Sequence, residues 1–171
     1  IESTIEKRKL ISVLGNMVMY HNGLKDVMQL DSLFELWKVD SEIDRSELGE
    51  ASTTIPKLHY KYYKLYSQER LTLRKLEAEY KVLFKDKWEY YQGNMSEEDL
   101  KEREWEPFPL KVLKTDIDKY IDSDTDIVKH NYKIEYQKEK IDFLESVIRS
   151  INNRGFQIKN AIDWEKFKVG I

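Results

Sequence analysis

The sequence contains no cysteine, only six glycines and three prolines, and no long uninterrupted apolar segment. Without thiols the chain can form neither disulfides nor thiolate metal sites. The scarcity of glycine and proline argues against a fold built from many short strands and turns, and it leaves long stretches free to be helical. The apolar-rich stretch at residues 10–20 is too short and too polar to span a bilayer. These absences favour an all-α protein without a membrane span.

The residue patterns of a catalytic centre are also missing. The three histidines are scattered without ligand spacing, and neither a Ser-His-acid arrangement nor a glycine-rich phosphate loop is present. The acidic residues at 122–126 imitate the start of a calcium loop, but Ile127 replaces its turn glycine and Lys133 its bidentate glutamate. Helix capping by Ser123 or Asp124 is the favoured interpretation. We therefore expect no enzyme, no metal site and no cofactor.

Charge is abundant but unevenly distributed. Charged residues make up 36% of the chain, with 29 basic and 32 acidic side chains. Residues 57–91 hold nine basic and five acidic side chains, whereas residues 93–109 hold two basic and six acidic ones. A basic helix followed by an acidic connector indicates a charged partner or self-association. An ordinary solvated helix face is the alternative.

Apolar residues at spacings of three and four predict a principal helix from Pro56 to about Tyr91, which ends near Gly93. Proline is favourable in a first helical turn because its missing N–H group needs no partner there. The remaining expected elements are helical pieces within residues 2–29, a short helix at residues 32–37 capped by Asp31, a turn-like stretch at residues 38–54, a short acidic helix after Ser96, and a stiff link at residues 107–109.

The C-terminal third carries a seven-residue repeat of isoleucine that is typical of associating helices. Its apolar pattern breaks at residues 152–155 and then resumes. We predict packing between subunits, with a helical hairpin inside one subunit as the alternative. The candidate oligomerisation residues are Ile134, Ile141, Leu144, Ile148, Ile151, Phe156, Ile158 and Ile162.

Cations and large aromatic residues occur together at the end of the principal helix. Cations neutralise phosphates, and aromatic faces stack on unpaired bases, so the combination suits single-stranded nucleic acid. The alternative is that the aromatic residues seal the helix end against a neighbour while the lysines are solvated. The candidate nucleic-acid-binding residues are Arg74, Lys75, Lys81, Lys85, Lys87, Trp88, Tyr90 and Tyr91.

Several segments, taken together and in order, resemble the UvsY-type recombination mediators of T4-like bacteriophages. The similarity extends over about residues 28–171. The segments that carry it are Pro56–Tyr62, Lys75–Ala78, Lys81-Val82, Lys85–Gly93 and the ending Asn153–Lys159, with its Arg-Gly-Phe-x-Ile-Lys motif.

The resemblance implies a non-enzymatic, ring-like homo-oligomer in the cytoplasm of the bacterial host. Such a ring binds single-stranded DNA, contacts the single-strand-binding protein, and helps a RecA-like recombinase to displace that protein. The family's DNA-binding basic pair falls on Lys85 and Lys87. The second member is lysine rather than the more familiar arginine, so phosphate geometry is expected to be looser. Asp86 between them is expected to offset part of the local potential.

These observations predict three regions: an N-terminal extension (1–27), a helical DNA-binding region with an acidic connector (28–110), and a C-terminal helical oligomerisation region (111–171). Held side by side in a ring, weak DNA-binding patches gain avidity without new contacts. A helical scaffold that bridges two proteins without touching DNA, using the acidic residues at 97–106, is the rival interpretation. A membrane-surface helix at residues 1–27 is a third.

Overall fold

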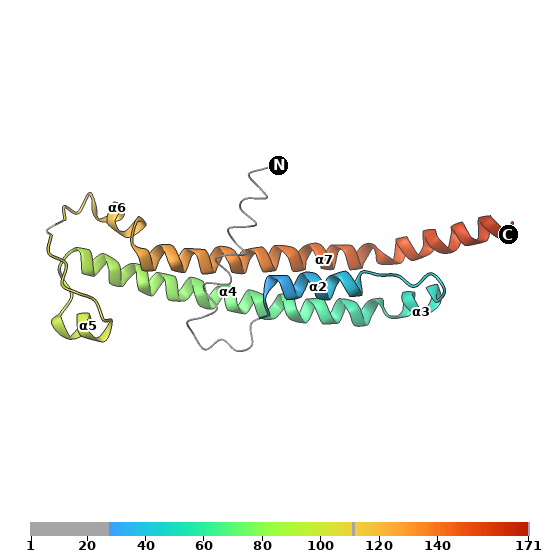
Figure 1. Cartoon of the computed structure of the whole chain (residues 1–171), viewed down its shortest axis with the longest axis horizontal. Helices are drawn as coiled ribbons and strands as arrows, with labels where there is room; N and C mark the ends of the chain where they lie inside the picture. Colours follow the sequence, from blue (N-terminus) through green and yellow to red (C-terminus); the bar gives the residue numbers. More distant parts are fainter. Residues whose placement is uncertain (1–27, 111, 171) are drawn as a thin grey trace. The chain divides into compact units, whose positions relative to one another are not determined.

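The computed structural model describes residues 28–110 and 112–170 of the chain. These residues form six helices and no strand (Figure 1). The helices are α2 (Leu30–Asp40), α3 (Leu48–Thr53), α4 (Ile55–Tyr91), α5 (Glu97–Glu102), α6 (Ile117–Asp122) and α7 (Thr125–Val169). The predicted all-α fold class is confirmed. The N-terminal extension, with its expected helical pieces and the membrane-surface alternative, lies outside the described residues.

The limits of α4 follow from local sequence, as predicted. Pro56 is its second residue, and the helix continues without interruption to Tyr91. The chain then turns at Gly93, whose φ of 72° lies in the left-handed region that glycine adopts without steric cost. The amide of Gly93 donates to the carbonyl of Tyr90, which satisfies one of the last helical carbonyls.

Two N-terminal expectations were wrong in detail. Asp31 does not cap α2: Gln29 is the N-cap residue, and Asp31 lies in the first turn, where a carboxylate favours the positive end of the helix dipole. The helix extends past Trp37 to Asp40, and the stretch expected to be turn-like contains α3. Helix α2 gains from core packing through Leu33, which a local pattern does not reveal.

The short helices and the start of α7 are defined by capping side chains. The Ser96 hydroxyl accepts a hydrogen bond from the amide of Asp99 and caps α5, as expected. At the start of α7 the Asp124 carboxylate accepts from the amides of Asp126 (2.8 Å) and Ile127 (3.2 Å). The calcium-like sequence is thus a helix cap. No cluster of metal-ligating side chains occurs among the residues that the structure describes.

The described residues belong to two compact units. Unit 1 contains Leu73–Tyr136, and unit 2 contains residues 28–72 and 137–170. The domain boundary expected between residues 110 and 111 therefore lies inside unit 1. Unit 2 contains residues from both sides of that boundary. In neither is there a helix, within the described ranges, long and apolar enough to cross a membrane.

Unit 2 is built on a hydrophobic core shared by α2, the first half of α4 and α7. Its fully buried members are Leu33, Tyr62, Leu144, Val147 and Ile151. Phe34 of α2 meets Phe143 of α7 edge to face, with ring centroids 4.6 Å apart. The isoleucine-leucine seam of α7 thus packs inside one chain in this unit, as the hairpin alternative stated.

Burial of the seam corrects the choice of oligomerisation residues. Within a single chain Ile134, Ile141, Leu144, Ile151 and Ile158 are already buried, and Ile148 and Ile162 are partly buried. Of the eight candidates only Phe156 is exposed. Nor does the helix break where the apolar pattern does, because α7 continues through residues 152–155 to Val169.

Arg154 explains why the pattern changes there without ending the helix. Its guanidinium is buried and donates hydrogen bonds to three carbonyls at the C-terminal end of α2: Asp40 (3.0 Å), Ser41 (3.1 Å) and Glu42. A helix C-terminus exposes carbonyls that lack partners, and a cation there also favours the helix dipole. Arg154 therefore ties the end of α2 to α7 within unit 2.

The core of unit 1 joins the end of α4 to α6 and the start of α7. Its buried members are Tyr91, Ile117, Ile121 and Ile127, with Phe108 of the stiff link packed against them. Because residues 107–109 are not helical, as predicted, the link can carry Phe108 back onto the aromatic rings at the end of α4. This core holds the segment from which the candidate site is built.

Candidate nucleic-acid interface

The last half of α4 presents two chemically different faces. Arg74, Lys81, Lys85 and Trp88 follow at spacings of seven, four and three residues, so they share one helix face. All four are exposed, whereas Lys87 is buried with Tyr91 on the opposite side. We call the exposed set the outer α4 face.

The cations of the outer α4 face are free or only weakly paired. Lys85 Nζ lies 3.5 Å from Glu89 Oε1, an exposed pair one helical turn away whose contribution to stability is small. Arg74 and Lys81 form no ion pair with any described residue. The Trp88 side chain is 41% exposed. Lys75, also exposed, lies about 100° around the helix and pairs with Glu79 at 3.8 Å.

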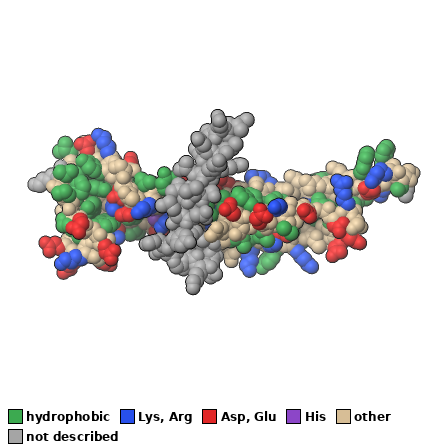
Figure 2. Space-filling model, in the orientation of Figure 1, with side chains coloured by type: hydrophobic (Ala, Val, Ile, Leu, Met, Phe, Trp, Pro, Cys, Tyr) green, Lys and Arg blue, Asp and Glu red, His purple; other side chains and the backbone are tan. Residues whose placement is uncertain are grey.

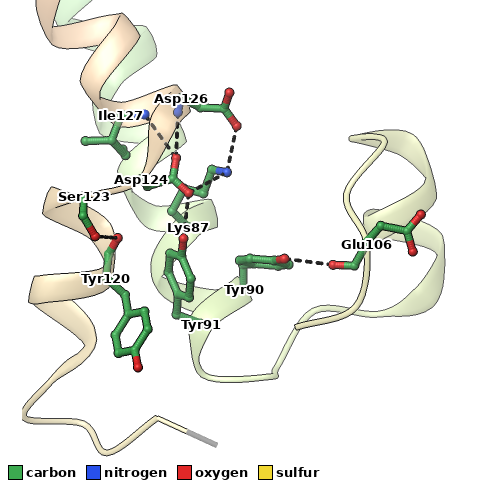
Figure 3. A network of polar contacts seen from close by, with 9 residues as sticks. All are labelled: Lys87, Tyr90, Tyr91, Glu106, Tyr120, Ser123, Asp124, Asp126 and Ile127. Carbon is green, nitrogen blue, oxygen red and sulfur yellow. Dashed lines mark hydrogen bonds and ion pairs between the residues drawn. The ribbon is translucent and has the colours of Figure 1, made fainter. Parts of the chain in front are cut away.

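Lys87 occupies a different environment. Its ammonium lies 2.9 Å from Asp124 Oδ2 and 2.8 Å from Asp126 Oδ2, and its side chain is only 5% exposed (Figure 3). The ammonium also lies 3.9 Å from the centroid of the Trp105 ring, within cation–π distance. Lys87 thus ties the end of α4 to the start of α7, and it does not present a charge on the outer face.

Asp124 contacts Lys87, Tyr91 and the first amides of α7. While its Oδ1 caps α7, its Oδ2 accepts a hydrogen bond of 2.8 Å from the Tyr91 hydroxyl (Figure 3). Burial acts to raise the pKa of Asp124, but hydrogen bonds from Lys87, Tyr91 and the Ile127 amide outweigh it and hold the pKa below its ordinary value. Burial, followed by the bond to Asp124, raises the pKa of Tyr91. At neutral pH Asp124 is therefore a carboxylate and Tyr91 a neutral phenol.

Tyr90 and Tyr91 close the end of the helix, as the alternative interpretation of these aromatic residues stated. The Tyr90 hydroxyl donates to the carbonyl of Glu106 at 2.8 Å, and its ring meets Trp105 edge to face. The Tyr91 ring meets Phe108 edge to face with centroids 4.9 Å apart. Trp88 is thus the candidate aromatic residue that keeps an exposed ring.

Asp86 is neutralised by the connector that follows the helix. It is buried, and its Oδ2 lies 2.7 Å from Arg103 Nη2. The expectation that Asp86 offsets the potential around Lys85 was therefore wrong, because the acid faces inward and has its own cation. The otherwise acidic connector supplies that cation.

The helical period alone separates Lys85 from Lys87. Residues two apart on a helix point about 200° from each other, so a basic pair at such a spacing cannot occupy one exposed face. The spacing does not say which member is buried. That depends on Asp124 and Asp126, more than 35 residues further along the chain.

Comparison with known proteins identifies the family of this chain. The family model described as "Recombination, repair and ssDNA binding protein UvsY" matches residues 36–171. The recombination protein UvsY of Enterobacteria phage T4 is 26% identical over 143 residues, which cover 84% of this chain and 99% of the T4 protein. The family resemblance predicted from the sequence is confirmed.

Solved structures agree in fold. Two crystal structures of the bacteriophage T4 recombination mediator protein UvsY, in lattice types IV and II, each match with a TM-score of 0.72 and 25% identity. They cover 82% and 84% of this chain, and the match includes 99% of each T4 chain. The chain belongs to the UvsY family of recombination, repair and single-stranded-DNA-binding proteins.

Proposed function

We propose that this protein binds single-stranded DNA through the outer α4 face and, as an oligomer, helps to load a RecA-like recombinase onto DNA covered by single-strand-binding protein. It acts by binding and presenting the strand, with no covalent step and no cofactor. The family relationship favours this role over a scaffold that never touches DNA, and it suggests the cytoplasm of the bacterial host as the place of action.

The observation that carries the proposal is the composition of the outer α4 face. Arg74, Lys81 and Lys85 provide three exposed cations on a face that also carries the exposed Glu77, and the neighbouring acid Glu89 is engaged by Lys85. Phosphates are attracted to such cations, and a base stacked on Trp88 would contribute about 1–3 kcal/mol. We assign Lys87, Tyr90 and Tyr91 to the support of this face, because their polar groups are engaged within the protein.

We further propose that copies associate through the C-terminal end of α7. Phe156, Trp164, Phe167 and Val169 are all more than half exposed there, and the Trp164 and Phe167 rings stack with centroids 5.7 Å apart. Hydrophobic side chains stand out at this end of the helix in Figure 2. Several exposed aromatic residues on one helical segment favour a protein partner. Association would place several outer α4 faces on one particle and raise avidity by about 10²–10⁴.

Replacing Arg74, Lys81 and Lys85 together with alanine is expected to weaken binding to single-stranded DNA and to reduce its salt dependence. Each lost phosphate contact lowers the slope of log K against log salt by about 0.7, so the slope should fall by roughly 2. Fluorescence anisotropy with a labelled oligonucleotide at several salt concentrations measures this slope. Lys119→Ala, which removes an exposed and already paired lysine of unit 1, is the control. An unchanged slope in the triple variant would exclude the outer α4 face from the DNA site.

Replacing Trp164 and Phe167 with serine is expected to lower the native mass of the assembly. Both rings are exposed, so helix content measured by circular dichroism should stay unchanged while apolar surface available to a second copy disappears. Light scattering coupled to gel filtration measures the mass. Leu113→Ser, which removes a comparably exposed apolar side chain of unit 1, should leave the mass unchanged. An intact assembly in the double variant would place the contact between copies elsewhere.

A further inference from the structure

Unit 2 carries a second set of exposed cations and rings, on the first half of α4. Lys57, Tyr60 and Lys64 follow at spacings of three and four residues, and Tyr63 flanks them one turn from Tyr60. Tyr60 is 70% exposed and Tyr63 is 52% exposed. We call these four residues the N-terminal α4 patch. In Figure 2, Lys and Arg side chains project from the edge of unit 2 formed by this half of the helix.

The cations of the N-terminal α4 patch are not neutralised within the described part of the chain. Neither Lys57 nor Lys64 forms an ion pair with a described residue. The single acid between residues 57 and 72 is Glu69, which is buried and pairs with Lys140 at 2.6 Å. Lys61, on the same half of the helix, is instead paired with Asp40 at 2.5 Å. The patch therefore offers positive charge without a free carboxylate within residues 57–72 of its helix.

The exposed Tyr63 ring of the patch has aromatic neighbours on its own helix. His59 stacks on Tyr63 with centroids 5.8 Å apart and an interplanar angle of 12°. The Tyr63 ring also lies near the ring of Tyr66, whose hydroxyl donates to Glu145 at 2.7 Å. Tyr63 thus has neighbours that limit its orientation while half of its surface is open. An ordered, exposed ring loses little conformational entropy when a base stacks on it.

We propose that the N-terminal α4 patch is a second contact for single-stranded DNA, formed by residues separate from the outer α4 face. This inference rests on the proposed function, since both surfaces would bind the same class of ligand. Lys57 and Lys64 are seven residues apart, about 10 Å along the helix, so one strand can lie along both. The patch combines exposed tyrosines with lysines and holds no exposed acid. Such a surface suits single-stranded nucleic acid, which carries both phosphates and base rings, better than it suits an apolar protein surface.

The test compares three variants of the full chain with wild type on an oligo-dT strand. Lys57→Ala with Lys64→Ala is expected to lower the salt slope by roughly 1.4, for two phosphate contacts. Tyr60→Leu with Tyr63→Leu is expected to weaken binding about tenfold or more for each base that no longer stacks. The tyrosine variant should bind an abasic strand as wild type does, because that strand has no bases to stack. Lys38→Ala with Val39→Ala, which alters exposed residues of α2 in unit 2, is the matched control.

The outcomes separate this proposal from the proposed function. If the lysine and tyrosine variants bind like wild type while the variant of Arg74, Lys81 and Lys85 binds weakly, the N-terminal α4 patch is not a DNA contact but the function stands. If wild type does not bind single-stranded DNA, both fail. A reduced native mass in the tyrosine variant would identify the patch as a contact between copies and overturn the proposal.

Discussion

Lys87→Met is expected to lower the free energy of unfolding by about 3 kcal/mol while leaving the salt dependence of DNA binding unchanged. Removing one partner of a buried ion pair leaves an uncompensated charge, which costs about 3–5 kcal/mol. Asp124 is buried, but Asp126 is 44% exposed and can recover hydration, so the lower end of that range applies. Urea denaturation measures the stability, and anisotropy titrations at several salt concentrations measure the slope.

Lys85→Met provides the matched comparison, because it makes the same substitution two residues away on the opposite side of the helix. It is expected to leave stability nearly unchanged, since its pair with Glu89 is exposed, and to lower the salt slope by about 0.7. The two substitutions should therefore affect different measurements. If Lys87→Met lowered the slope as much as Lys85→Met without loss of stability, Lys87 would be a phosphate contact and our assignment would be wrong.

The pH dependence of the Lys87→Met effect provides a second readout. In the folded protein the pKa of Asp124 lies below its ordinary value, so its stabilising contribution is present at neutral pH and is lost as pH falls through the folded-state pKa. A protonated Asp124 no longer requires the ammonium of Lys87. The stability difference between wild type and variant should thus be largest near neutral pH and shrink below about pH 4. Adding Asp124→Asn, which keeps a capping oxygen without the charge, should recover part of the loss at pH 7.

Lys140→Met is expected to destabilise unit 2 by about 3–5 kcal/mol, because it leaves the buried Glu69 carboxylate without its cation. Lys140 is fully buried, and its ammonium lies 2.6 Å from Glu69 Oε2. Burial acts to lower the pKa of Lys140 more than Glu69 acts to raise it, so the pKa lies below its ordinary value. Urea denaturation of the variant measures the loss.

A second substitution distinguishes the unpaired charge from lost packing. Glu69→Gln in the Lys140→Met background removes the charge and keeps an oxygen that can accept from Gln137, which now donates to Glu69 at 2.5 Å. The double variant should therefore be clearly more stable than Lys140→Met alone. Lys159→Met, at an exposed position of α7, is the control and should be nearly neutral. Equal stability of the single and double variants would show that packing, not charge, is what Lys140 contributes.

Local chemistry determined where several helices begin and end. Pro56 at the start of α4, Gly93 after its end, Ser96 before α5 and Asp124 before α7 act through their own backbone conformation or through amides within three residues. Such interactions need no tertiary partner. The sequence alone therefore predicted the principal helix, the helix cap at Asp124, and the family.

Tertiary packing alone decided which face of each helix is buried and what covers it. A seven-residue apolar repeat has the same period whether its partner is α2 of the same chain or a helix of another, so the seam of α7 could not reveal its own partner. The two lysines at 85 and 87 were separable by helical period, but only Asp124 and Asp126 determine that Lys87 is the buried one. Burial depends on residues distant in sequence, and a local pattern contains no information about them.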